Sequence, residues 1–138
     1  MPRWLKAGCA YFAVVFAAGF ALGTIRVLLL LPRMSELAAV VLETPIILAV
    51  CWFVSGWAMR RFAAHWSSGD ALLMGSVAFL LLMLAEIVLS LTVFDTTLAG
   101  YFGRLATAAG LIGLAGQLLF GLFPTLRVHL RSNAGLLT

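Results

Sequence analysis

The sequence predicts an all-α integral membrane protein, a bundle of four transmembrane helices joined by short loops. Of its 138 residues, 64% are hydrophobic and 10% are charged, whereas soluble domains are about 45–50% apolar and about 25% charged. Four apolar stretches each reach the roughly 20 residues that a spanning helix needs, and together they occupy most of the chain. We therefore expect a single membrane domain over residues 1–138, with little mass outside the bilayer.

The first apolar stretch predicts a helix over about 7–31, which ends where Pro32 lacks the N–H that a continuing helix requires. Its basic start resembles a signal peptide, but the stretch is longer than the about 7–15 apolar residues of a typical signal sequence. We therefore expect an uncleaved first helix. The linker 32–36 is short, and Ser35 is suited to cap a second helix over about 37–59.

The second half of the chain predicts two further helices. Asp70 is expected to cap a helix over about 71–94. Residues 95–104 mix apolar and small polar side chains, which indicates a short amphipathic turn or helix along the membrane interface. The last spanning helix is expected over about 105–123, ended by Pro124 and followed by a polar tail.

The basic residues predict the orientation, because Lys and Arg concentrate in cytoplasmic segments. With the N-terminus inside, the cytoplasmic side would carry Arg3, Lys6, Arg60, Arg61, Arg127 and Arg131, and the outer side only Arg33 and Arg104. Both termini are therefore predicted to be cytoplasmic. Three tryptophans fall at the same predicted interface, where tryptophan is enriched: Trp4, Trp57 and Trp66.

Several classes of function are disfavoured. The basic residues stand singly or in pairs at the ends of apolar stretches, so we expect no nucleic-acid partner. Cys9 and Cys51 lie inside apolar stretches and form no CxxC pair or cysteine–histidine metal set. No HExxH, phosphate-loop or GxSxG motif occurs. We expect no metal, no cofactor and no enzymatic activity; the expected partners are the lipid bilayer and other membrane proteins or a second copy.

Three charged residues and one glutamine fall inside the expected helices: Arg26, Glu43, Glu86 and Gln117. An ionisable residue near a helix centre costs about 2.5–3.5 kcal/mol and is by default a functional candidate with a partner. At 1.5 Å per residue, Arg26, Glu43 and Glu86 lie roughly 8, 9 and 12 Å below the outer ends of their helices. Gln117 lies about halfway along the fourth helix. These side chains are expected to form one polar cluster in the outer half of the bundle.

The charges of this cluster do not balance, because one arginine cannot neutralise two carboxylates. Low dielectric and like-charge repulsion would then favour uptake of a proton or a cation by Glu43 or Glu86. A structural alternative stays open, in which Arg26 and one glutamate simply link two helices. In that case Arg33 or Arg104 could complete the charge balance.

Small residues mark one face of the first and fourth helices, with Gly19 and Gly23 on the first and Ala109, Gly113 and Gly121 on the fourth. Such residues allow helices to approach closely. They motivate the leading functional hypothesis, a non-enzymatic membrane protein that acts through other helices as an accessory subunit, assembly factor or homo-oligomer. The alternative is a small proton- or cation-linked transporter or channel that uses the polar cluster.

The segments Gly19–Val27, Pro32-Arg33, Glu43-Thr44-Pro45 and Trp57–Arg61 resemble a group of small, uncharacterised bacterial inner-membrane proteins, in which a G-T-I-R-V helix precedes an E-x-P helix. The resemblance covers mainly the first half of the chain. It implies a four-helix protein of the bacterial inner membrane and links Arg26 with Glu43 in one motif. It implies no activity.

Overall fold

The computed structural model describes residues 1–136, and within this range every regular element is a helix. The long helices are α1 (Arg3–Ile25), which continues into the π-helix η1 (Arg26–Leu30), α2 (Glu36–Phe62), α3 (Ser68–Thr92) and α5 (Ala108–Leu136), and the short helix is α4 (Leu98–Leu105). The four long helices are long and apolar enough to cross a membrane. They confirm the predicted all-α chain and indicate a multi-pass membrane protein.

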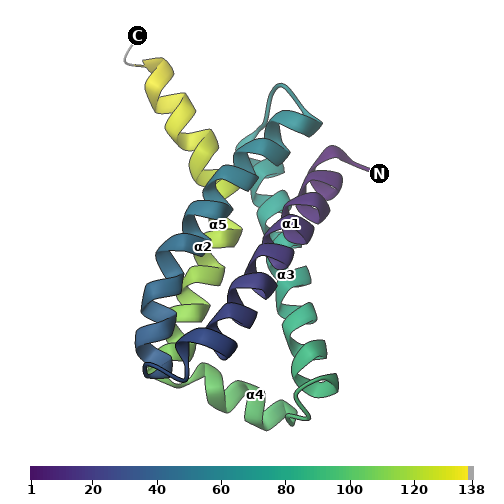
Figure 1. Cartoon of the computed structure of the whole chain (residues 1–138). Coiled ribbons are helices and arrows are strands. Elements are labelled where there is room, and N and C mark those ends of the chain that lie inside the picture. Colours follow the sequence, from purple (N-terminus) through teal and green to yellow (C-terminus); the bar gives the residue numbers. More distant parts are fainter. Residues whose placement is uncertain (137–138) are drawn as a thin grey trace.

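The long helices form a bundle in which α1 and α5 each pack against both α2 and α3 (Figure 1). The N-terminus, the α2–α3 connection and the C-terminal part of α5 lie at one end, which we call the terminal end. The α1–α2 connection and α4 lie at the other, which we call the α4 end. The order around the bundle is therefore α1, α2, α5, α3, with α1 and α5 on one diagonal.

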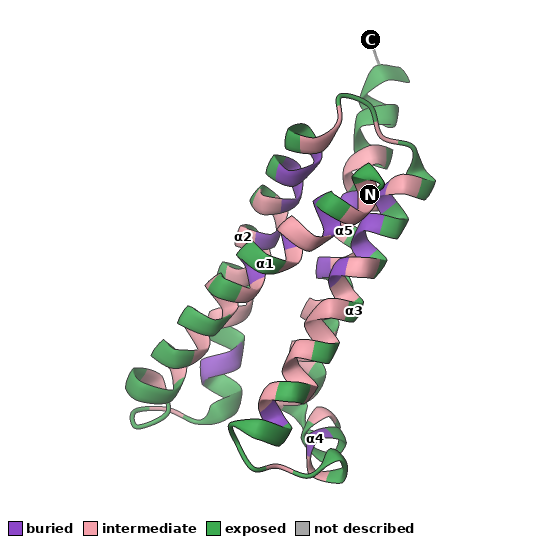
Figure 2. Cartoon of the chain, turned by 90° about the vertical axis from the view of Figure 1, so that its right-hand side faces the viewer, coloured by how far each residue is buried: buried purple, intermediate pink, exposed green. Residues whose placement is uncertain are grey.

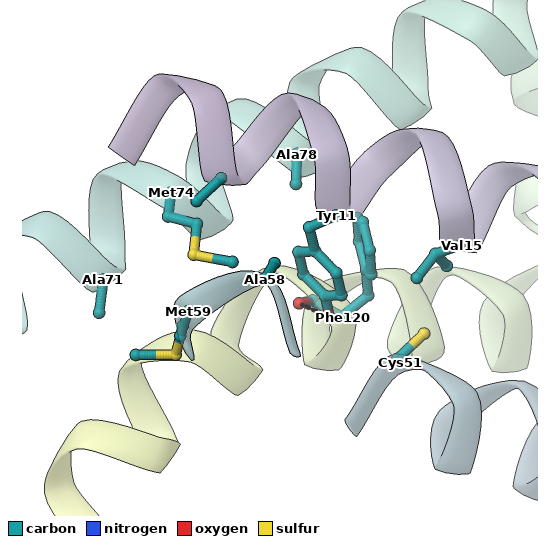
Figure 3. Packing of buried hydrophobic residues seen from close by; sticks show 10 residues of the cluster. Tyr11, Val15, Cys51, Ala58, Met59, Ala71, Met74, Ala78 and Phe120 are labelled. Carbon is teal, nitrogen blue, oxygen red and sulfur yellow. Dashed lines mark hydrogen bonds between the residues drawn. The ribbon is translucent and has the colours of Figure 1, made fainter. Parts of the chain in front are cut away.

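The buried core lies nearer the terminal end, whereas residues toward the α4 end are mostly half-buried or exposed (Figure 2). The core cluster is drawn in Figure 3 and consists of Ala7, Tyr11, Val15, Cys51, Ala58, Met59, Ala71, Met74, Ala78 and Phe120. Many large apolar side chains outside it are exposed, among them Phe53, Leu80 and Leu84. This distribution suits helices whose outer faces contact lipid.

Glycines set the closest helix contacts. A Cβ at Gly75 on α3 would overlap the carbonyl oxygen of Gly121 on α5, so these two backbones touch directly. A Cβ at Gly8 on α1 would lie only 2.9 Å from the carbonyl oxygen of Met74. In lipid, where helices gain little from the hydrophobic effect, such close contacts contribute much of the association energy.

Pro124 lies inside α5 and does not end it, so the expectation of a last helix over about 105–123 is wrong. Proline has no N–H, which leaves the carbonyl oxygen of Phe120 without its donor one turn earlier. The hydroxyl of Tyr11 on α1 donates to this oxygen at 2.8 Å. The rings of Tyr11 and Phe120 also pack together in the core, with their centres 4.4 Å apart (Figure 3). The helix continues to Leu136; the expected polar tail is helical there, and residues 137–138 lie outside the described residues.

Two expected helix caps have different outcomes. Ser35 is confirmed as the cap of α2, because its hydroxyl oxygen accepts the amide hydrogen of Ala38. Asp70 is wrong as the cap of α3, which begins earlier and is capped by Ser67. The Asp70 carboxylate forms an ion pair with Arg3, and so ties the starts of α3 and α1 together.

The short helix expected near residues 95–104 is confirmed as α4. Thr97 caps it by accepting the amide hydrogen of Gly100 at 3.0 Å. Tyr101 is buried against the bundle, whereas Leu98 and Phe102 are exposed. The helix thus has one face on the protein and an apolar face free to contact lipid.

Candidate functional site

A cavity of about 470 Å³ lies among α1, η1, α2, α3 and α5. Cys51 and Phe120 bound it on the side of the core, and aromatic walls come from Phe16, Phe20 and Phe94. Six polar residues line it: Thr24, Arg26, Glu43, Thr44, Glu86 and Gln117. A mostly apolar cavity with a few convergent polar groups is the usual form of a small-molecule site.

Arg26 and Glu43 form an ion pair in the wall of this cavity, with Nη1 of the arginine 2.9 Å from Oε2 of the glutamate. The arginine is the first residue of η1, where the chain leaves α-helical geometry, and its partner lies on α2. Their side chains are 32% and 13% exposed. Each charge therefore has its counter-ion, and the pair links the first two helices near the α4 end.

Glu86 on α3 is bound by Gln117 on α5, whose Nε2 lies 2.7 Å from each carboxylate oxygen. The amide oxygen Oε1 of Gln117 is buried, and no donor within residues 1–136 reaches it. An unsatisfied buried acceptor costs about 1–3 kcal/mol.

Glu86 has no counter-ion at contact distance among residues 1–136. Within the described residues the ion pairs are Arg3–Asp70 and Arg26–Glu43. The guanidinium of Arg33 donates to the carbonyl oxygen of Leu29, and that of Arg104 to the hydroxyl of Ser90. Neither of these two arginines pairs with Glu86, so the charge balance that the sequence left open is not completed by them.

Helix α4 adds a third group to the carboxylate. The hydroxyl of Tyr101 donates to Oε2 of Glu86 over a long distance of 3.4 Å. Burial, and then the negative charge of Glu86, raises the pKa of Tyr101 to about 12, so its phenol remains a donor at neutral pH. Together with the contact between Arg104 and Ser90 at 3.3 Å, this bond attaches α4 to α3.

The four polar residues predicted as one cluster thus line one cavity but divide into two pairs. Arg26 pairs with Glu43, and Gln117 binds Glu86. The sequence did not indicate Tyr101 as a ligand of Glu86. The sequence contained one indication of this role: an aromatic residue with a polar hydroxyl group in a segment that was expected to lie along the membrane interface.

Three of the small residues that were expected to lie at contacts between helices do not lie at such contacts. Gly19, Gly23 and Gly113 line the cavity. A Cβ at Gly19 would meet only Ile47 at 3.9 Å, and one at Gly113 would meet nothing within 4 Å. The expected close approach does not occur there within the chain. Instead, their missing side chains leave room inside the cavity.

Ala109 is half-buried near the start of α5. Gly121 differs from the cavity glycines because it lies at the close α3–α5 contact.

Sequence reasoning also missed Arg127, because Pro124 was taken as the end of the helix. In the structure its Nε donates to the carbonyl oxygen of Trp52 at 3.1 Å and to the hydroxyl of Ser55 at 3.0 Å. Its guanidinium carbon lies 4.0 Å from the centre of the Trp52 ring. Arg127 is thus a contact between α5 and α2.

The four long apolar helices indicate the class, a multi-pass helical membrane protein, and the cavity is a polar site inside this apolar bundle. Comparison with known protein families, with curated proteins and with solved structures finds no match to this chain.

Proposed function

We propose that the protein is a small cation- or proton-linked membrane transporter that binds its cation at Glu86. One observation carries this proposal: the Glu86 carboxylate faces a cavity and has hydrogen-bond donors but no counter-ion among the described residues. A carboxylate in a low-dielectric site gains most from a positive charge, either a proton or a bound cation.

The walls of the cavity indicate which cations would fit. Phe16, Phe20 and Phe94 and several aliphatic side chains line most of it, and aromatic faces attract cations. A cation with an apolar body would place its charge at Glu86 and bury its body against these walls. The Glu86 carboxylate itself would accept a hydrogen bond from a protonated amine.

We further propose that the protein lies in a bacterial inner membrane with both termini in the cytoplasm. The basic residues outside the polar cluster support this orientation, with six near the terminal end and two near the α4 end, namely Arg3, Lys6, Arg60, Arg61, Arg127 and Arg131 against Arg33 and Arg104. The remaining basic residue, Arg26, lies inside a helix and is paired with Glu43. The cavity would then lie in the outer half of the membrane.

A protein that acts through other helices is the second candidate, as an accessory subunit, assembly factor or homo-oligomer. The small-residue faces motivated it, but Gly19, Gly23 and Gly113 line the cavity. The packing argument therefore favours it less than the sequence alone does. A stoichiometric membrane partner that copurifies through α1 or α5 would restore it.

The test is equilibrium binding of tetraphenylphosphonium to the protein in lipid nanodiscs. We expect Glu86→Gln to weaken binding by roughly tenfold or more, which corresponds to about 1.4 kcal/mol. Glu36→Gln is the matched control, because Glu36 is exposed in the first turn of α2, and it should leave binding unchanged.

Tetraphenylborate has the same shape and the opposite charge, so it controls for partition into lipid. Equal effects of Glu86→Gln on both ions, or no effect on the cation, would contradict the proposal.

A further inference from the structure

A second set of charges lies at the terminal end, on the opposite side of the core from the cavity. Helices α2 and α5 meet there at Gly56, where a Cβ would lie 2.7 Å from the guanidinium carbon of Arg127. The bonds from Arg127 to Trp52 and Ser55 hold the two helices in this arrangement. The contact therefore provides a rigid base.

One turn further along each helix is another arginine. Arg60 follows Gly56 by four residues on α2, and Arg131 follows Arg127 by four on α5. Residues four apart lie on one helix face, so both arginines extend from the contact between the helices. Arg127 itself lies at this contact, so each of the other two arginines lies one helical turn from it.

Within residues 1–136, these arginines have no acidic partner. Of the five acidic residues of the chain, Asp70 is the one in the described part of the terminal end, and it is paired with Arg3. Arg60 and Arg131 are exposed, and no carboxylate within residues 1–136 forms an ion pair with either. Like charges one turn from a common contact repel one another unless an anion binds between them.

The surroundings indicate the source of the anion. Three exposed apolar residues lie beside the arginines or up to one turn from them toward the middle of the bundle: Trp57, Leu126 and Leu130. In a membrane, this surface contacts acyl chains while the arginines reach the headgroup level. A free phosphate would use only the charged part of this surface, whereas a phospholipid would use both.

We propose that Arg60 and Arg131, supported by the Arg127 contact, bind the phosphate of an anionic phospholipid whose acyl chains lie along Trp57, Leu126 and Leu130. Arginine suits this role because its forked donors match phosphate oxygens. The site is separate from Glu86 and does not depend on the cation-binding proposal.

The test is native mass spectrometry of the protein titrated with phosphatidylglycerol or phosphatidylcholine of identical acyl chains. We expect the wild-type protein to bind phosphatidylglycerol roughly tenfold more tightly, and Arg60→Gln with Arg131→Gln to reduce this preference to about twofold or less. Arg33→Gln with Arg61→Gln removes the same number of charges and should keep the preference.

Three results would overturn the proposal. The wild-type protein would show no preference for the anionic lipid, or the control pair would lose the preference to the same extent. Alternatively, millimolar glycerol phosphate would displace the lipid, which would show that the arginines select a free phosphate rather than a phospholipid.

Discussion

Gln117 holds both carboxylate oxygens of Glu86 with a single amide nitrogen, 2.7 Å from each. This bond joins α3 and α5 beside the cavity and fixes where the carboxylate points. The amide oxygen of the same glutamine stays without a donor among the described residues. One side chain thus positions the acid and links the two helices.

The pair Arg26–Glu43 should behave as a coupled unit. Arg26→Leu or Glu43→Leu leaves one charge without its counter-ion in an apolar site, so we expect each to lower the free energy of unfolding by about 3 kcal/mol. The double variant removes both charges and should cost clearly less than the sum. Unfolding in mixed detergent micelles measures the three values. Additive losses would show that the two side chains do not interact.

The hydrogen bond from Tyr11 to Phe120 should depend on Pro124. Tyr11→Phe leaves the Phe120 carbonyl without a donor, and we expect a loss of about 1–2 kcal/mol in the free energy of unfolding. Pro124→Ala introduces an amide N–H that can donate to the same carbonyl. In that background the cost of Tyr11→Phe should fall close to zero.

Pro45→Ala is the matched control for this double-mutant cycle, because Pro45 also lies inside a spanning helix but Tyr11 donates elsewhere. The cost of Tyr11→Phe should be unchanged in that background. An equal cost in all three backgrounds would show that Tyr11 does not replace the donor that proline lacks.

Tyr101 should ionise at a higher pH than an ordinary tyrosine. The chain has two tyrosines, so Tyr11→Phe leaves Tyr101 as the single phenol, and its phenolate absorbance should appear near pH 12 rather than near the ordinary value of about 10. Because folding raises this pKa, the stabilisation is fully present below about pH 10 and is lost as the pH rises toward about 12.

Adding Glu86→Gln to this variant removes the negative charge and should lower the pKa of Tyr101, though burial keeps it above the ordinary value. A phenol that titrates near pH 10 with and without Glu86 would contradict the contact between α4 and the carboxylate.

The four long helices could be predicted from the sequence because each depends on a continuous run of apolar residues. The common depth of Arg26, Glu43 and Glu86 followed from helical rise alone, and all three line the same cavity. Which glutamate pairs with Arg26 could not be predicted. Helix α1 packs against both α2 and α3, so the choice depends on how the helices rotate about their axes.

The end of α5 could not be predicted for a related reason. Proline usually ends a helix because one carbonyl oxygen loses its donor. Here the missing donor comes from Tyr11, which is far away in sequence. The same error placed Arg127 in a tail rather than at the contact with Trp52 and Ser55. Bonds between distant helices are not visible in local sequence patterns.

The most direct test of the central proposal is the affinity for tetraphenylphosphonium measured in nanodiscs as a function of pH. Protons and the cation compete for Glu86, which is surrounded by Gln117 on α5, Tyr101 on α4 and, across the cavity, the Arg26–Glu43 pair. We predict that affinity rises as the pH rises, and that Glu86→Gln removes both the tight binding and its pH dependence. Equal, pH-independent affinities of the wild-type protein and Glu86→Gln would contradict cation binding at Glu86.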